Sequence, residues 1–259
     1  MNLPKDNIVT LAEHAKVFIF DHHLGEEIST VFHHNPVIKG EDPNNYPSAS
    51  WIINTFLGND INLFAILGII GDHEQNIKHN PFFHHHINDF CRDHNLTFDE
   101  LHKMVHLLDS NYKVGDKQAV EHAPRFLLEH GTGDAILHNK EWNKQYETLN
   151  EEMEQQLRLP DQMIGDIILK KIHTPYNIIS TITRNVSWSS GKNTVVVNTG
   201  FFSDKDQVYV RSNKNLEPMI MQGKSLGLKC GGKKEVLGAI VPKNQTDLFV
   251  DEIIKFLSV

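Results

Sequence analysis

The spacing of hydrophobic positions along the chain predicts alternating strands and helices, and therefore an α/β fold. Residues 15–20 form an apolar run rich in β-formers, which is typical of a buried strand, and a second strand is expected within 31–38. Residues 48–57 have the spacing of a helix that lies between a proline and a glycine. Residues 62–70 are apolar on nearly all sides, so we expect them to form a buried element.

The rest of the chain predicts a helical middle followed by a second α/β alternation. The helical middle is expected at 99–111, 117–129 and 139–159, and the last of these helices ends at a proline. Strands are then expected at 166–173, 194–202, 207–211 and 236–241, with helices at 178–183, 216–226 and 247–258. We therefore predict two domains, 1–135 and 161–259, joined by a connecting helix within 136–160.

The composition is that of an ordinary folded protein and excludes one that spans a membrane. Hydrophobic residues make up 39% of the 259 positions and charged residues 22%. The longest apolar run, 61–70, is far shorter than the roughly 20 residues that a transmembrane helix needs. Two distant cysteines, Cys91 and Cys230, do not form a disulfide framework. The first residues do not resemble an export signal, so we expect a cytoplasmic protein.

Charge is divided unevenly along the chain, although the formal net charge is only −8. Residues 1–160 hold 12 Lys or Arg against 24 Asp or Glu, whereas residues 161–259 hold 13 against 9. This asymmetry indicates an acidic half suited to metal-assisted chemistry and a basic half that holds an anion. Chance clustering of solvated surface charge is the alternative.

An Asp-His-His tripeptide directly after the first predicted strand is a candidate for metal chemistry. Asp21, His22 and His23 offer a carboxylate and two imidazoles, which suit Mn²⁺ or Mg²⁺ and can also act as an acid or a phosphate ligand. A hydrogen-bonded pair at a strand end is the alternative. Asp72 closes the buried apolar element and needs a partner there, which either a metal ion or a helix N-terminus would provide.

A glycine-bearing turn predicted at 230–234 is a candidate for phosphate binding. The backbone N–H groups at Gly231 and Gly232 can approach phosphate oxygens closely, and Lys233 adds positive charge. Arg211, at the end of a predicted strand, would be a second phosphate contact. An ordinary turn between a helix and a strand, and an exposed arginine, are the alternatives.

The order of these pieces resembles the DHH–DHHA1 phosphoesterase superfamily, and within it the archaeal-type RecJ-like exonucleases specific for single strands. The resemblance covers nearly the whole chain. Its strongest stretches are Val17–His23, Asn35–Pro36, Tyr46–Ala49, Gly68–Asp72 and Ser110–Lys113. It implies an α/β fold with an incomplete DHH-type parallel-sheet domain, linked by helices to a smaller DHHA1 domain with a mixed sheet.

The resemblance also implies roles for the candidate residues. His22 and Asp72 would ligate one ion of a two-metal site that takes Mn²⁺ or Mg²⁺, and Asp21 would orient His22. His23 would contact the scissile phosphate. The DHHA1 domain would hold single-stranded DNA or RNA through Arg211 and the glycine turn.

The sequence departs from the family pattern at two places. Two earlier aspartate motifs supply most ligands of the other metal ion in the family, and this sequence has no counterpart for the first of them. For the second, Asn2 stands where the bridging aspartate is expected. Lys233 stands in place of the histidine that usually follows the glycines. These departures imply an N-terminally truncated, partly degenerate relative whose hydrolysis is weak or lost and which still binds anions.

Three functions remain open on the sequence. The first is a RecJ-like phosphoesterase relative that acts on or binds single-stranded nucleic acid, and intact Asp21–His23 and Asp72 favour this chemistry. The second is a catalytically inactive scaffold whose partners are replication or repair proteins, which the missing motifs favour. The third is a phosphatase that acts on oligonucleotides or dinucleotides.

Overall fold

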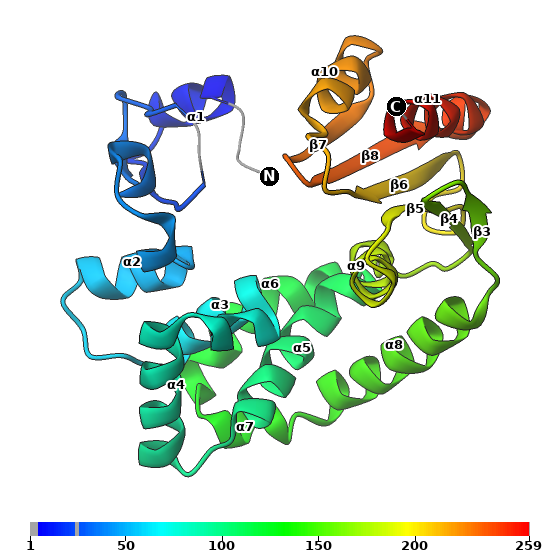
Figure 1. Ribbon diagram of the computed structural model, residues 1–259. Coiled ribbons are helices and arrows are strands. Elements are labelled where there is room, and N and C mark those ends of the chain that lie inside the picture. Colours follow the sequence, from blue (N-terminus) through cyan, green and yellow to red (C-terminus); the bar gives the residue numbers. More distant parts are fainter. Residues whose placement is uncertain (1–4, 24–25, 259) are drawn as a thin grey trace. The chain divides into compact units, whose positions relative to one another are not determined.

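A computed structural model describes residues 5–23 and 26–258, which group into two compact units (Figure 1). The N-terminal unit contains the residues up to 109 together with 122–143, and the C-terminal unit contains 110–121 and the residues from 144 onward. We expected two domains that follow each other along the chain, with boundaries at residues 135 and 160. Within the described residues, the chain instead crosses between the two units three times, each time within a helix. These helices are α5 (Phe98–Val114), α6 (Lys117–His130) and α8 (Lys140–Arg158).

The N-terminal unit is mostly helical and carries a small parallel sheet. Its strands are β1 (Phe18–Phe20) and β2 (Phe32–His34), and Phe18 lies opposite Phe32. Its further helices are α1 (Lys5–Ala12), α2 (Ala49–Phe56), α3 (Leu63–His73), α4 (Pro81–His94) and α7 (Gly133–Leu137), with 3-10 segments at 37–39, 43–45 and 74–79. No helix among the described residues has the length and apolarity to cross a membrane.

The apolar element predicted at 62–70 is the buried helix α3, and Asp72 lies in its last turn. The side chain of Asn62 accepts a hydrogen bond from the N–H of Ala65 and caps the helix. Gly68 lets α3 approach α2 closely, because a Cβ atom at this position would collide with the side chain of Ser50. The close approach of these two helices fixes where α3 ends and therefore where Asp72 lies.

Replacing Gly68 with alanine should destabilise the N-terminal unit by about 1–3 kcal/mol, because the added methyl group displaces Ser50. Gly71→Ala is the matched control, since a Cβ atom there would lie an ordinary 3.5 Å from Val105 Cγ1. This control should stabilise α3 by about 0.5–1 kcal/mol through its higher helix propensity. Urea denaturation of both variants measures the difference, and equal stabilities would contradict the close packing of α2 and α3.

The C-terminal unit is built on a six-stranded mixed sheet. Its strands, in spatial order, are β3 (Gln162–Ile164), β4 (Ile167–Ile172), β5 (Asn193–Asn198), β6 (Lys205–Arg211), β8 (Val236–Pro242) and β7 (Lys229–Lys233). Strands β4 and β5 are parallel, and the other neighbours are antiparallel. The small parallel sheet and this separate mixed sheet confirm the predicted α/β fold class.

Helices cover both faces of this sheet. On one face, Val195, Val208 and Leu237 pack against α10 (Glu217–Ser225) and α11 (Thr246–Ser258). On the other face, Ile168 and Val196 pack against α9 (Ile179–Ser190) and the second half of α8. Figure 1 shows α9 and α11 on opposite sides of the sheet. Burial on both faces explains the apolar runs Ile167–Leu169 in β4 and Val195–Val197 in β5.

The glycine turn predicted at 230–234 is wrong, because these glycines lie in the edge strand β7. Gly231 pairs with Gly238 and Gly232 with Leu237 of β8. At Gly232, φ is 156°, and a Cβ atom would collide with the carbonyl oxygen of Val236. A close approach between two strands, rather than a turn, therefore requires glycine at this position.

A buried lysine joins the end of α8 to the sheet. Lys170 in β4 is 1% exposed. Its ammonium group donates hydrogen bonds to the carbonyl oxygens of Leu157 (3.2 Å) and Leu159 (2.5 Å) and to Oδ1 of Asp161 (2.9 Å). Lys170 therefore satisfies carbonyl groups that the end of a helix leaves without partners.

Candidate metal centre and anion-binding face

Asp21 organises the turn that follows β1. Its Oδ1 atom accepts hydrogen bonds from the backbone N–H groups of His22 (2.8 Å) and His23 (3.1 Å) and from the Nδ1–H group of His23 (2.7 Å). Burial raises the pKa of Asp21, but these hydrogen bonds outweigh burial and hold the pKa below its ordinary value. Asp21 is therefore ionised at neutral pH and fixes the ring of His23.

His22 directs one ring nitrogen toward Asp72. Because a carbonyl oxygen only accepts hydrogen bonds, Nδ1 of His22 carries the proton and donates it to the carbonyl oxygen of Tyr46 (3.2 Å). Nε2 lies 3.5 Å from Oδ2 of Asp72. Burial lowers the pKa of His22, although Asp72 acts in the opposite direction. Neutral His22 thus presents a lone pair toward a carboxylate.

This orientation differs from the expected one. The expectation was that Asp21 orients the ring of His22, whereas Asp21 holds the ring of His23 and the carbonyl group of Tyr46 holds the ring of His22. The reason is local: a carboxylate bound to two successive N–H groups reaches the side chain two residues later. Tyr46 lies in a stretch that carried the family resemblance, but its contribution is a backbone atom, which no side-chain pattern reveals.

Buried polar groups hold the segments around the tripeptide. The side chain of Asn35, 1% exposed, donates to the carbonyl oxygen of His23 (2.8 Å) and accepts from the N–H of Val37 (3.0 Å). The Nε2–H group of His73 donates to the carbonyl oxygen of Pro47 (3.0 Å). The turn and the loop before α2 are therefore positioned by specific hydrogen bonds.

The arrangement of His22 and Asp72 fits a divalent cation. A lone pair and a carboxylate that face each other repel unless a proton or a cation lies between them. A metal-binding histidine ordinarily donates its other ring N–H to a carbonyl or carboxylate group, as His22 does to Tyr46. The side chain of Asp72 is 47% exposed, so water can reach the same position.

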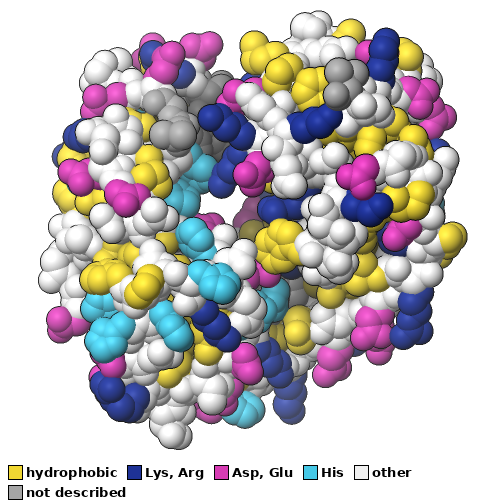
Figure 2. Space-filling model, viewed as in Figure 1, with side chains coloured by type: hydrophobic (Ala, Val, Ile, Leu, Met, Phe, Trp, Pro, Cys, Tyr) yellow, Lys and Arg dark blue, Asp and Glu magenta, His cyan; other side chains and the backbone are white. Residues whose placement is uncertain are grey.

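Among the described residues, this candidate centre offers two potential protein ligands, His22 and Asp72. Figure 2 shows histidine side chains gathered on the visible surface of the N-terminal unit. No group of three or more potential ligands comes together in the described ranges. The expectation for Asn2 concerns a position outside the described residues.

Arg211 lies at the end of β6 beside an exposed tryptophan. The guanidinium groups of Arg211 and Arg184 lie 5.3 Å and 5.4 Å from the ring of Trp188, which is 49% exposed. Within the described residues, the buried Nε of Arg211 has no hydrogen-bond acceptor. Burial raises the pKa of Tyr209, and the same two arginines partly offset this effect. Two cations therefore converge on one face of the sheet, beside Tyr209.

Strand pairing places Lys233 on the same face as Arg211. Both residues lie opposite Val236 of β8, one on each side, so their side chains leave the sheet in the same direction. Gly231 is in the next row on this face, whereas Gly232 belongs to the opposite face. We call Arg184, Trp188, Tyr209, Arg211 and Lys233 the basic face. The sequence did not indicate Arg184 and Trp188 as members of this face, because both are distant from Arg211 in the chain.

Comparison with solved structures places this fold among RecJ and DHH-domain proteins. RecJ from Thermus thermophilus, in complex with Mn²⁺, superposes with a TM-score of 0.69 at 17% identity, over 98% of this chain and 43% of RecJ. An exonuclease RecJ bound to manganese gives a TM-score of 0.63 at 14% identity, over 98% of this chain and 72% of the other. The DHH domain of a member of the s1p family of ribosomal proteins superposes with a TM-score of 0.63 at 16% identity, over 97% of this chain and 66% of the other.

The chain thus spans less than half the length of the T. thermophilus RecJ. No protein-family model matches the sequence, and no curated protein matches it. The archaeal-type branch of the resemblance stays a prediction.

Proposed function

We propose that this chain, which has the RecJ-like DHH fold, is a phosphoesterase relative that binds single-stranded nucleic acid and a divalent cation. The observation that carries the proposal is the approach of His22 Nε2 to Asp72 Oδ2 at 3.5 Å. The hydrogen bond from His22 to the carbonyl group of Tyr46 aims the lone pair at Asp72. Two solved RecJ structures with this fold contain manganese, which makes Mn²⁺ the first cation to test.

His22 and Asp72 hold the cation in this proposal, and His23 faces the phosphodiester. A bound cation supplies charge that polarises the phosphodiester and stabilises the charge that develops during attack by water. Because Nδ1–H of His23 donates to Asp21, the ring is held in place, and Nε2 can donate to a phosphate oxygen in the imidazolium form of the ring. Two protein ligands leave most of an octahedral coordination sphere to water, so we propose weak cation binding and slow hydrolysis by this chain alone.

The basic face binds the backbone of the nucleic acid in this proposal. Arg211 and Lys233 flank one β8 residue, and Arg184 shares Trp188 with Arg211. The guanidinium group of Arg211, whose buried Nε–H has no acceptor in the described part of the chain, would bind a phosphate oxygen. The exposed ring of Trp188 provides a surface on which a base can stack.

Arg211→Ala should weaken the binding of a single-stranded DNA oligonucleotide and reduce its dependence on salt. Each phosphate contact contributes about −0.7 to the slope of log K against log salt on single strands, so the slope should flatten by about 0.7. Fluorescence anisotropy over a range of salt concentrations measures this slope. Lys255→Ala is the control, because α11 covers the opposite face of the sheet and its slope should not change.

The outcomes of this experiment separate the candidate functions. An unchanged slope for Arg211→Ala would contradict nucleic-acid binding by the basic face. With Mn²⁺ present, binding without cleavage of end-labelled DNA fits slow hydrolysis or a catalytically inactive scaffold. Rapid cleavage that His22→Ala abolishes would overturn slow hydrolysis and support the metal centre.

A further inference from the structure

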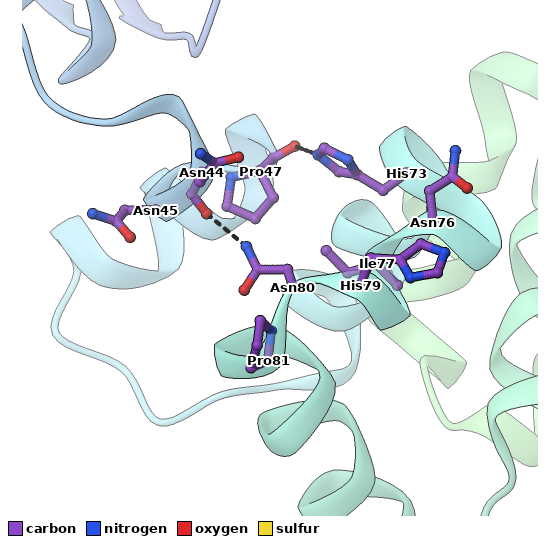
Figure 3. Close-up of a pocket in the computed structure, with 9 residues that line it drawn as sticks. All are labelled: Asn44, Asn45, Pro47, His73, Asn76, Ile77, His79, Asn80 and Pro81. Carbon is purple, nitrogen blue, oxygen red and sulfur yellow. Dashed lines mark hydrogen bonds between the residues drawn. The ribbon is translucent and has the colours of Figure 1, made fainter.

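A polar pocket in the N-terminal unit has not yet been assigned a role. Its volume is ≈ 480 Å³. Figure 3 shows that it lies between the loop before α2 and the segment that joins α3 to α4. It is lined by Asn44, Asn45, Pro47, His73, Asn76, Ile77, His79, Asn80 and Pro81.

The lining consists mostly of hydrogen-bonding asparagine and histidine side chains. Four of the nine residues are asparagines, and none is Lys, Arg, Asp or Glu. Within the described ranges, the side chains of Asn44, Asn76 and His79 make no hydrogen bond to the protein. Pro47 and Ile77 are buried and supply apolar surface. Such a lining suits a flat polar molecule better than an anion.

The pocket is held open by two hydrogen bonds across its walls. The side-chain amide of Asn80 donates a hydrogen bond to the carbonyl oxygen of Asn44 (3.0 Å). The Nε2–H group of His73 donates one to the carbonyl oxygen of Pro47 (3.0 Å). Asn80 also accepts a hydrogen bond from the N–H of Phe83 and so caps α4. The two walls are thus fixed relative to each other without a ligand, which reduces the cost of binding.

Both walls continue directly into the candidate metal centre. Pro47 follows Tyr46, whose carbonyl oxygen holds the ring of His22. His73 follows Asp72 in the last turn of α3. Two residues of the lining are thus the immediate neighbours of groups at the candidate metal centre.

We propose that this pocket binds the base of the nucleotide whose phosphate lies at His22 and Asp72. An asparagine amide presents a donor and an acceptor side by side, which matches the edge of an adenine. Pro47 and Ile77 contact the face of the base. The position of the phosphate rests on the proposed function, whereas the base site depends only on the pocket.

Adenosine without metal tests the base site directly. Titration of the ¹⁵N-labelled chain should shift the side-chain amide signals of Asn44, Asn76 and Asn80, whereas inorganic phosphate should not. Asn76→Ala should weaken adenosine binding roughly tenfold, because it removes one bidentate partner. The matched control is Asn88→Ala on the exposed side of α4, which should bind adenosine like the wild type.

Adenosine that shifts no pocket signal, or that binds Asn76→Ala as tightly as the wild type, would overturn the base site. A titration with adenosine 5′-monophosphate and Mn²⁺ then tests separately whether the phosphate binds at His22 and Asp72. The monophosphate should bind more tightly than adenosine, and Asp72→Asn should remove only that gain. If the wild type bound adenosine 5′-monophosphate with Mn²⁺ no more tightly than adenosine, the metal centre and the placement of the phosphate would be contradicted. The adenosine result would still support the base site in the pocket.

Discussion

Asp72→Asn should weaken Mn²⁺ binding at least tenfold relative to the wild type in a calorimetric titration. The substitution keeps the shape of the side chain but replaces a carboxylate with an amide, which is a much poorer ligand for a divalent cation. His22→Ala should have a similar effect, because the lone pair of Nε2 faces the same position at 3.5 Å from Oδ2. Wild-type binding itself should be weak, since water fills the remaining coordination positions.

The control for this titration is Asp60→Asn, which removes the same charge from an exposed residue of the same unit. It should leave Mn²⁺ binding unchanged, and circular dichroism should show that all variants are folded. Equal binding by wild type and Asp72→Asn would show that His22 and Asp72 form a structural pair and not a metal centre. That result would remove the main support for phosphodiester chemistry.

Lys170→Met should destabilise the C-terminal unit by about 2–4 kcal/mol. The methionine fills a similar volume but leaves the carbonyl groups of Leu157 and Leu159 without their buried donor. It also removes the partner of Asp161, whose side chain is 40% exposed, so water screens much of that loss. Native-state hydrogen exchange of the amides in β4 and β5 measures the stability of this unit separately.

Lys171→Met is the matched control, since Lys171 is the next residue in the same strand and its side chain is 60% exposed. Its ion pair with Asp247 (3.4 Å) is on the surface, so the change should stay within about 0.5 kcal/mol. Similar exchange rates in the two variants would contradict the structural role of Lys170. The comparison isolates burial, because the substitution is the same.

A strand before Asp21 could be predicted because an apolar run that stops at polar residues is typical of one, but β1 covers only Phe18–Phe20 and Phe18 is exposed, so the expected burial was wrong. The long helix α8 was equally clear from its spacing and from the proline after it. The strand at 229–233 was missed because glycine most often marks a turn, whereas Gly232 is required by the carbonyl group of a neighbouring strand. Such an approach depends on how the strands pair, which local sequence does not determine.

The candidate site shows the same division between local and distant information. The approach of His22 to Asp72 followed from the family resemblance, because fifty residues of sequence between them carry no spacing rule. The hydrogen bond to Tyr46 involves a backbone atom and has no sequence signature. The ring of Trp188 meets Arg211 only because α9 packs against β6.

The position of Trp188 allows intrinsic tryptophan fluorescence to report on the basic face. Of the three tryptophans, Trp142 is 5% exposed and therefore shielded from dissolved quenchers, and Trp51 is partly exposed in the N-terminal unit, so a Trp51→Phe variant removes its contribution. Trp188 is 49% exposed and lies beside two guanidinium groups. Its emission depends on the charges and the solvent around the indole ring, so a nucleic-acid strand on the basic face would change both the intensity and the access of iodide. Occupancy of that face can thus be followed in the unlabelled chain, by light emitted at the surface where contact occurs.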